Sequence, residues 1–77
     1  MIEGLAVGRI VHVKLGGNCR PAIIVQVWAD DKINAVCFVD GSNDGLPPGQ
    51  HTKWFTSLHY SDNHDELNSF HWPERVP

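Results

Sequence analysis

Residues 22–40 read AIIVQVWADDKINAVCFVD, and this stretch decides the fold. The first seven residues are apolar and rich in β-branched side chains apart from Gln26, which is typical of a buried strand. From residue 33 to 40, apolar residues recur at every second position, which predicts a half-buried strand. The inward face of that strand would hold Ile33, Ala35, Cys37 and Val39. The polar connection 30–32 is short, so the two strands are expected to form a hairpin.

Three further strands are predicted on either side of this hairpin. Residues 7–15 alternate between apolar and polar positions, and Gly16-Gly17-Asn18 reads as a turn. Pro21 is then expected at the first position of its strand or on an edge, because proline cannot donate to a strand ladder. Residues 69–72 form a short final strand that ends at Pro73. Residues 53–60 also alternate, with one face holding Trp54, Thr56, Leu58 and Tyr60 and the other Phe55, Ser57 and His59.

Together these patterns predict one all-β domain over residues 1–77. About five short antiparallel strands with turns between them favour an SH3-like small barrel, which closes to remove its edges. The long stretch 41–52 is rich in Gly and Pro and has no period, so it is expected to be a loop that is either functional or a disordered excursion. Residues 61–67 begin like a helix cap, and we expect about one helical turn.

Length and charge restrict the partners. Seventy-seven residues bury little surface, so we expect oligomerisation to supply part of the missing burial. The net charge is −3, and the six Lys and Arg residues are scattered, which disfavours binding to a nucleic acid polymer. No secretory signal or membrane-length apolar run is present, so a cytoplasmic protein without membrane association is expected. One disulfide is possible, but two reduced, buried thiols, Cys19 and Cys37, are expected in the cytoplasm.

The sequence disfavours two kinds of reactive site, a metal site and a nucleophilic cysteine. The histidines and cysteines lack the spacing of a zinc site, although His59, Asp62, His64 and Asp65 cluster enough to hold an adventitious cation. Cys19 beside Arg20 has the setting of an activated thiol, yet no catalytic motif accompanies it. The sequence therefore predicts a protein that is not an enzyme and uses no metal or cofactor. The alternative hypothesis is an enzyme with Cys19 as its nucleophile.

Aromatic and cationic residues favour a binding surface instead. The chain has more large rings than a five-strand barrel interior holds, and rings offer stacking faces to a base. Arginines offer forked donors that match phosphate, and histidines add donors that become cationic near neutral pH. The expected ligand is small and nucleotide-like. The candidate ligand-binding residues are Arg9, His12, Arg20, Trp54, His71, Trp72 and Arg75.

Three segments in this order resemble a group of short proteins of tailed bacteriophages. The group has Gly-Arg-Ile-Val-His near the start, Cys-Arg-x-Ala-Ile-Val after a Gly-rich turn, and Trp-His-Trp-Pro-Glu at the end. This chain has GRIVH at 8–12, CRPAIIV at 19–25 and FHWPER at 70–75. It departs from the group at Val13, Pro21 and Phe70. The strand order is also similar to Tudor and KOW barrels, which bind peptides, methylated lysines or RNA.

These resemblances imply function by binding. Small phage proteins of this size often bind a host protein or a host signal, and one class sequesters the nucleotide second messengers of antiphage systems. The leading expectation is thus a phage-encoded anti-defence sponge, acting without catalysis in the host cytoplasm as a homo-oligomer with its pocket at a subunit interface. The alternative is a protein- or peptide-binding SH3/Tudor-like module that blocks a host factor through the 41–52 loop and exposed rings.

Overall fold

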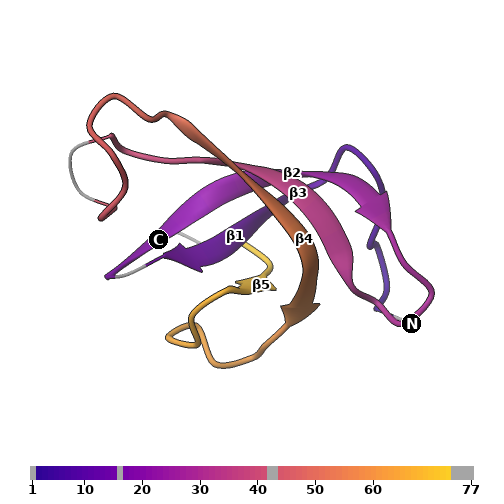
Figure 1. The fold of residues 1–77 in the computed structure, drawn as a ribbon. Helices are drawn as coiled ribbons and strands as arrows, with labels where there is room; N and C mark the ends of the chain where they lie inside the picture. The colour runs from indigo at the N-terminus through magenta and orange to yellow at the C-terminus, as the bar shows by residue number, and fades with distance from the viewer. Residues whose placement is uncertain (1, 16, 42–43, 74–77) are drawn as a thin grey trace.

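The hairpin at residues 22–38 lies within a closed barrel. The computed structural model describes residues 2–15, 17–41 and 44–73. Its strands are β1 (Ile10–Leu15), β2 (Asn18–Val27), β3 (Ile33–Phe38), β4 (Thr52–Tyr60) and β5 (Ser69–His71). Each strand pairs with the next, and β5 pairs with β1 to close the barrel (Figure 1). The prediction of an all-β, SH3-like small barrel is confirmed.

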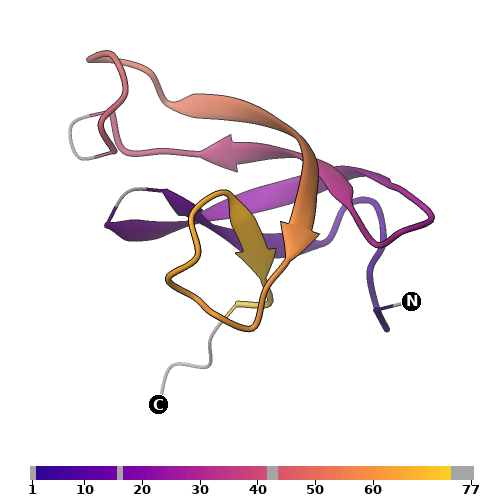
Figure 2. The ribbon, with the colours of Figure 1, turned by 60° about the horizontal axis from the view of Figure 1, so that its bottom comes forward.

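One seam of the barrel departs from the expected all-antiparallel order. The β4–β5 pairing is parallel, with His59 opposite Ser69 and Tyr60 opposite Phe70. After β4, residues 61–68 form an outward loop. The chain then enters β5 at Ser69, which stands opposite His59, so β5 runs in the same direction as β4 (Figure 2). The loop carries turns where one helical turn was expected: the Asn63 backbone N–H donates to Ser61 Oγ, and Asp65 N–H to Asn63 Oδ1.

Pro21 lies inside β2, which corrects its expected place at the strand start. It stands opposite His12 of β1. Ile24 N–H donates to the Arg9 carbonyl on the β1 side. By alternation the nitrogen of Pro21, three residues earlier, points to the β3 side. The β2–β3 register begins at Ala22, one residue after the proline, so that ladder needs no donor there.

Alternate residues of the strands fill the barrel. The expected inward face of the third strand is confirmed. Phe70 of β5 is fully buried at the closing seam. The buried apolar side chains of the described residues are Val11, Val13, Leu15, Ala22, Ile24, Ile33, Ala35, Cys37, Val39, Phe55, Leu58 and Phe70.

The simple alternation expected for residues 53–60 is wrong at Leu58. A register shift lets two residues of β4 oppose Asn34 of β3, so Phe55 and Leu58 both point inward. Ser57 takes a positive φ of 54° at this bulge. Its backbone N–H is satisfied by Asn34 Oδ1 at 3.0 Å, which also accepts the indole N–H of Trp28 at 3.1 Å. A bulge adds one residue to a strand and moves every later side chain to the other face.

The long loop after β3 projects from one end of the barrel, and the N-terminal segment lies at the other end (Figure 1). Val39 N–H donates to the His51 carbonyl, and Gln50 N–H to the Pro47 carbonyl. Residues 42 and 43 of this loop lie outside the described residues.

Candidate binding site

Barrel closure brings Arg9 and Trp72 together from opposite ends of the chain. Arg9 precedes β1 and Trp72 follows β5, and these antiparallel strands are aligned with His12 opposite His71. The Cζ atom of Arg9 lies 5.4 Å from the centroid of the Trp72 ring. Trp72 is half-buried and packs against the core, so the exposed guanidinium covers the ring from outside. Stacking orients the guanidinium and leaves its N–H donors available at the surface.

Arg9 differs from most other described cations in having no carboxylate partner. Within residues 2–15, 17–41 and 44–73, the carboxylate-paired lysines and arginines are Lys14 with Asp65, Arg20 with Asp44 and Lys32 with Asp30. Lys53 resembles Arg9, because its Nζ lies 5.2 Å from the Phe55 ring centroid and it too has no such partner in this part of the chain. A stacked guanidinium without a carboxylate is ready to accept an anion.

Three histidine rings form a cluster outside the barrel, beside the β1–β5 seam. The rings of His12 and His71 meet edge to face at 5.7 Å between centroids. His64 lies flat on His71 at 3.8 Å, with 9° between the ring planes. His71 is fully buried even though it points away from the core. Because water does not reach its ring here, His71 supports the site by packing, and direct contact with a ligand would need the cluster to open.

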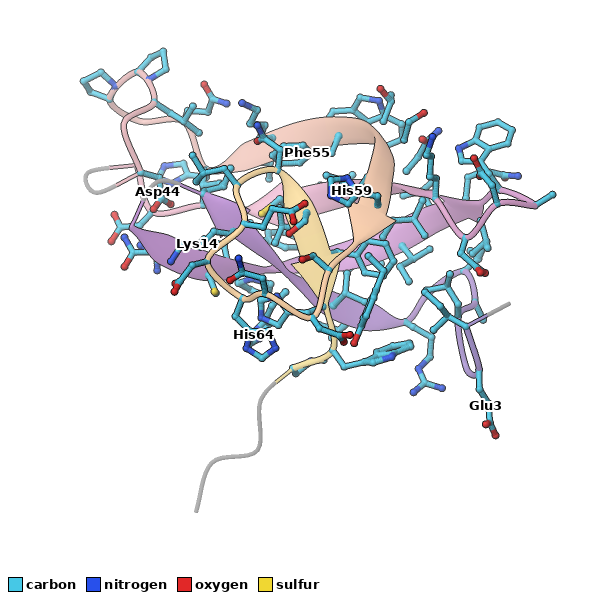
Figure 3. All side chains as sticks on the ribbon, turned by 90° about the horizontal axis from the view of Figure 1, so that it is seen from below. Glu3, Lys14, Asp44, Phe55, His59 and His64 are labelled. Carbon is cyan, nitrogen blue, oxygen red and sulfur yellow. The ribbon has the colours of Figure 1, made fainter. Side chains whose placement is uncertain are left out.

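The segment 61–68 holds this cluster in place by crossing β1 (Figure 3). Lys14 Nζ lies 3.3 Å from Asp65 Oδ1, and Asn68 N–H donates to the Lys14 carbonyl. The Cys19 thiol donates to the His64 carbonyl at 3.8 Å. These contacts tie residues 64–68 to both β1 and β2, so His64 keeps its position over His71.

His12 is the half-buried member of the cluster. Its Nδ1 atom is buried and has no hydrogen-bond partner among the residues that the structure describes. An unsatisfied buried polar atom costs about 1–3 kcal/mol, so it marks a place where water or a ligand atom would bind favourably. As with His71, contact of this atom with a ligand would need the histidine cluster to open.

Arg20 belongs to a different part of the barrel. It is aligned with inward-facing Val13, four residues along β1 from Arg9, or about 13 Å at the rise of a strand. Its Nε donates to both carboxylate oxygens of Asp44, at 3.1 and 2.9 Å. This bond is the main reason that the pKa of Asp44 lies below its ordinary value, and the Asp40 backbone N–H adds to it. The pair closes the barrel end beneath the long loop, and the predicted convergence of Arg20 with Arg9 does not occur.

The two remaining candidate residues also lie apart from Arg9 or beyond description. Trp54 is on the outer face of β4, opposite Val36 of β3, and is 52% exposed. β4 does not pair with β1, so the ring is separate from Trp72. Arg75 falls outside the described residues.

The cysteines lie on opposite faces of the sheet, and both are free thiols, as expected. The expected burial is confirmed for Cys37, which is fully buried inside the barrel, and is wrong for Cys19, which is half-buried and points outward under His64. Burial raises the pKa of the Cys37 thiol to about 11, and the charge of Asp44 adds to this shift. Cys37 is therefore a neutral core residue at physiological pH.

The polar residues suspected of holding a cation are each engaged separately. His59 contacts the Glu66 carboxylate, and this bond holds the pKa of Glu66 below its usual value. Asp62 bonds to Tyr60, whose pKa is raised as a result, and Asp65 pairs with Lys14. In the described parts of the chain, no three His, Cys, Asp or Glu side chains are grouped as metal ligands.

Sequence reasoning missed two contributors, His64 and Asp44. Both come from loops and act on residues of distant strands, so no local periodicity reveals them. The one available signal for Asp44 is that it is the only carboxylate between Gly41 and His51. His64 was noted only as a possible cation ligand, because the sequence does not show that its loop folds over β1.

Within the described residues, the fold forms no enclosed pocket and no helix with the length and apolarity to cross a membrane. No protein-family model, curated protein or solved structure matches the sequence, so proposals about function rest on the contacts described above.

Proposed function

We propose that this chain is a non-catalytic binding protein that captures a small phosphate-bearing ligand at Arg9, beside Trp72 and His12. The observation that carries the proposal is the guanidinium of Arg9, stacked on Trp72 without a carboxylate partner in the described residues. The phage resemblance suggests the setting: a nucleotide-derived antiphage signal would be sequestered in the cytoplasm of the host.

The chemistry of the site favours phosphate over other ligands. Arginine presents donors in a planar fork that bonds two phosphate oxygens at once, and stacking on an indole fixes that fork before the ligand arrives. His12, three residues farther along β1, has a buried Nδ1 without a hydrogen-bond partner in the described residues, which a ligand would reach if the histidine cluster opened. With a net charge of −3, the protein as a whole repels polyanions, so an anion is held only by a local cation, which favours one small anion over a nucleic acid polymer.

Titration calorimetry with a panel of cyclic mono-, di- and trinucleotides and cyclic ADP-ribose isomers tests this. We expect one class to bind, and Arg9→Ala to weaken it roughly 10- to 100-fold, as for loss of a charged hydrogen bond. Arg9→Lys should fall in between, because lysine keeps the charge but loses the fork. Lys53→Ala is the matched control, since Lys53 is also a cation over a ring. Equal loss in Arg9→Ala and Lys53→Ala would overturn the assignment of the site.

The alternative function, a protein- or peptide-binding module, is favoured by the exposed rings of Phe38 and Trp54. Pull-down from host lysate discriminates the two. A captured protein that is lost with Trp54→Ala and retained with Arg9→Ala would favour the alternative. A captured protein lost with Arg9→Ala alone would place a protein partner at Arg9 and contradict a small-ligand site there, whereas capture of no protein would agree with the proposed function.

A further inference from the structure

Over residues 21–26, β3 and residues 52–57, the outer face of the β2–β3–β4 sheet carries no charged residue and holds a row of apolar side chains. Ile23, Val36 and Trp54 lie side by side in register across the three strands. Around this row, Val25 is 43% and Phe38 45% exposed. The same face also carries outward-facing residues that are polar or proline. Within 21–26, 33–38 and 52–57 these are Pro21, Gln26, Asn34, Thr52, Thr56 and Ser57.

Freedom from charge sets this face apart from the rest of the chain. Charged residues make up 19% of the sequence, yet none of these outward positions carries one. Depletion of charge and enrichment of aromatics characterise the centre of protein interfaces. A phosphate backbone or an anionic headgroup would find no cation here. The chemistry of the face thus fits a neutral, apolar protein surface.

We infer that the occupant of this face is a second copy of the same chain, packed sheet against sheet about a two-fold axis. This row can pack against a copy of itself. Trp54 is a large ring at one end, Ile23 is an aliphatic residue of intermediate size at the other end, and Val36 lies between them. With the axis along β3, Trp54 of each copy packs on Ile23 of the other, and the two Val36 residues meet at the centre. Opposing a large side chain to a smaller one keeps the spacing near the ~10 Å of stacked sheets.

The available area agrees with this occupant. The exposed parts of the apolar side chains come to on the order of 400 Å², taking ~150–250 Å² for a whole aromatic side chain. The neutral polar residues around them extend the face toward the ~800 Å² that one partner of a standard interface buries. That is about a sixth of the 4829 Å² accessible surface of the described chain. A small domain gains most from such burial, because its own core is small.

This assignment goes beyond the proposed function and removes Trp54 from the candidate ligand residues. Its ring serves association and lies on β4, which does not pair with β1, whereas Arg9 precedes β1 and borders the Ile23 end of the row. Dimerisation and ligand capture are therefore separable by mutation.

Sedimentation velocity over a wide concentration range tests the dimer. The wild-type chain should reach twice its 8.6 kDa mass. Trp54→Glu should raise the dimer dissociation constant roughly 100-fold, because the carboxylate would be buried without a partner. Leu67→Glu is the matched control, since Leu67 is 54% exposed, close to Trp54 at 52%, and lies off this face. A wild-type chain that stays monomeric, or a dimer that survives Trp54→Glu, would overturn the inference.

A mixing experiment tests the geometry and guards against misfolded variants. Trp54→Glu and Ile23→Lys should each be monomeric alone, with the strand-rich circular dichroism of the wild type. Mixed in equal amounts they should form a heterodimer, because the introduced carboxylate of one copy faces the introduced ammonium of the other. A mixture that stays monomeric contradicts the proposed pairing. Retention of nucleotide binding in the monomeric Trp54→Glu chain would show that the two proposals stand or fall separately.

Discussion

At the scale of single residues, two pairs explain the chemistry of the barrel: Arg20 with Asp44, which are largely buried, and the exposed Arg9 over the half-buried Trp72. Arg20 and Asp44 close one end, and Arg9 covers Trp72 near the other. The charges of Arg20 and Asp44 neutralise each other, so this pair stabilises the fold and is not available to a ligand. The second leaves forked donors at the surface. Two arginines of similar appearance in the sequence therefore have different roles.

The Arg20–Asp44 pair predicts a defined acid response. The pKa of Asp44 is lowered in the folded state, so its contribution to stability is present above the unfolded value near ~3.9 and is lost as pH falls through the folded value. Urea unfolding of the wild type and Asp44→Asn should show the wild type more stable at neutral pH. The difference should shrink below about pH 4. A difference that is constant down to strong acid would contradict the ion pair as its source.

The two thiols should react differently with alkylating agents. Thiolate is the reactive form, and Cys37 is fully buried with its pKa raised to about 11. Mass spectrometry after iodoacetamide treatment of the native protein at mildly alkaline pH should find the label on Cys19 alone. Addition of urea should expose Cys37 to the same reagent. Equal native labelling of both cysteines would show that the barrel does not protect Cys37.

At the scale of elements, β5 is short but closes the barrel. Phe70 is fully buried between β1 and β4, and its ring meets Tyr60 edge to face at 5.6 Å. Phe70→Ala should lower the free energy of unfolding by about 3–5 kcal/mol, measured by urea titration. Leu67→Ala, nearby but exposed, should change it by less than ~0.5 kcal/mol. If Phe70→Ala fails to fold, Phe70→Leu should retain the fold with a smaller loss; equal stability of the Phe70 and Leu67 variants would contradict the closing role.

The strands were predictable from the sequence because alternation reports a local property, the burial of one face. The inward positions of β1 and β3 follow from that pattern. The bulge at Ser57 was not predictable, because it depends on the Asn34 side chain of another strand. The parallel β4–β5 seam likewise depends on the path of residues 61–68, which carry no periodic pattern.

The site, like the fold, could be predicted from the sequence only in part. The GRIVH and FHWPER segments, which carry several of the candidate residues, meet at the β1–β5 seam, where Arg9 meets Trp72 and His12 meets His71. The sequence places Arg20 among the candidate ligand residues because it shows the cation but does not show which carboxylate pairs with it. Its carboxylate lies 24 residues away in a loop, and only the folded chain brings them together.

At the scale of the whole molecule, we propose that two surfaces of one small barrel carry separate tasks. The β1–β5 seam holds Arg9 and the histidine cluster, and the outward residues of 21–26, β3 and 52–57 carry no charge. Catalytic turnover has no place in this arrangement as we propose it, because capture of a signal needs only affinity and one binding site per chain or per pair of chains.

Stoichiometric capture followed by heat release is the measurement that tests the proposed function most directly. Increasing amounts of protein are incubated with the nucleotide signals, and the free ligand is quantified before and after heat denaturation. We predict that one signal disappears in proportion to the protein added and returns chemically intact on heating. Depletion of none of the signals, or loss of many ligand molecules per chain with a changed product on release, would contradict a non-catalytic binding protein.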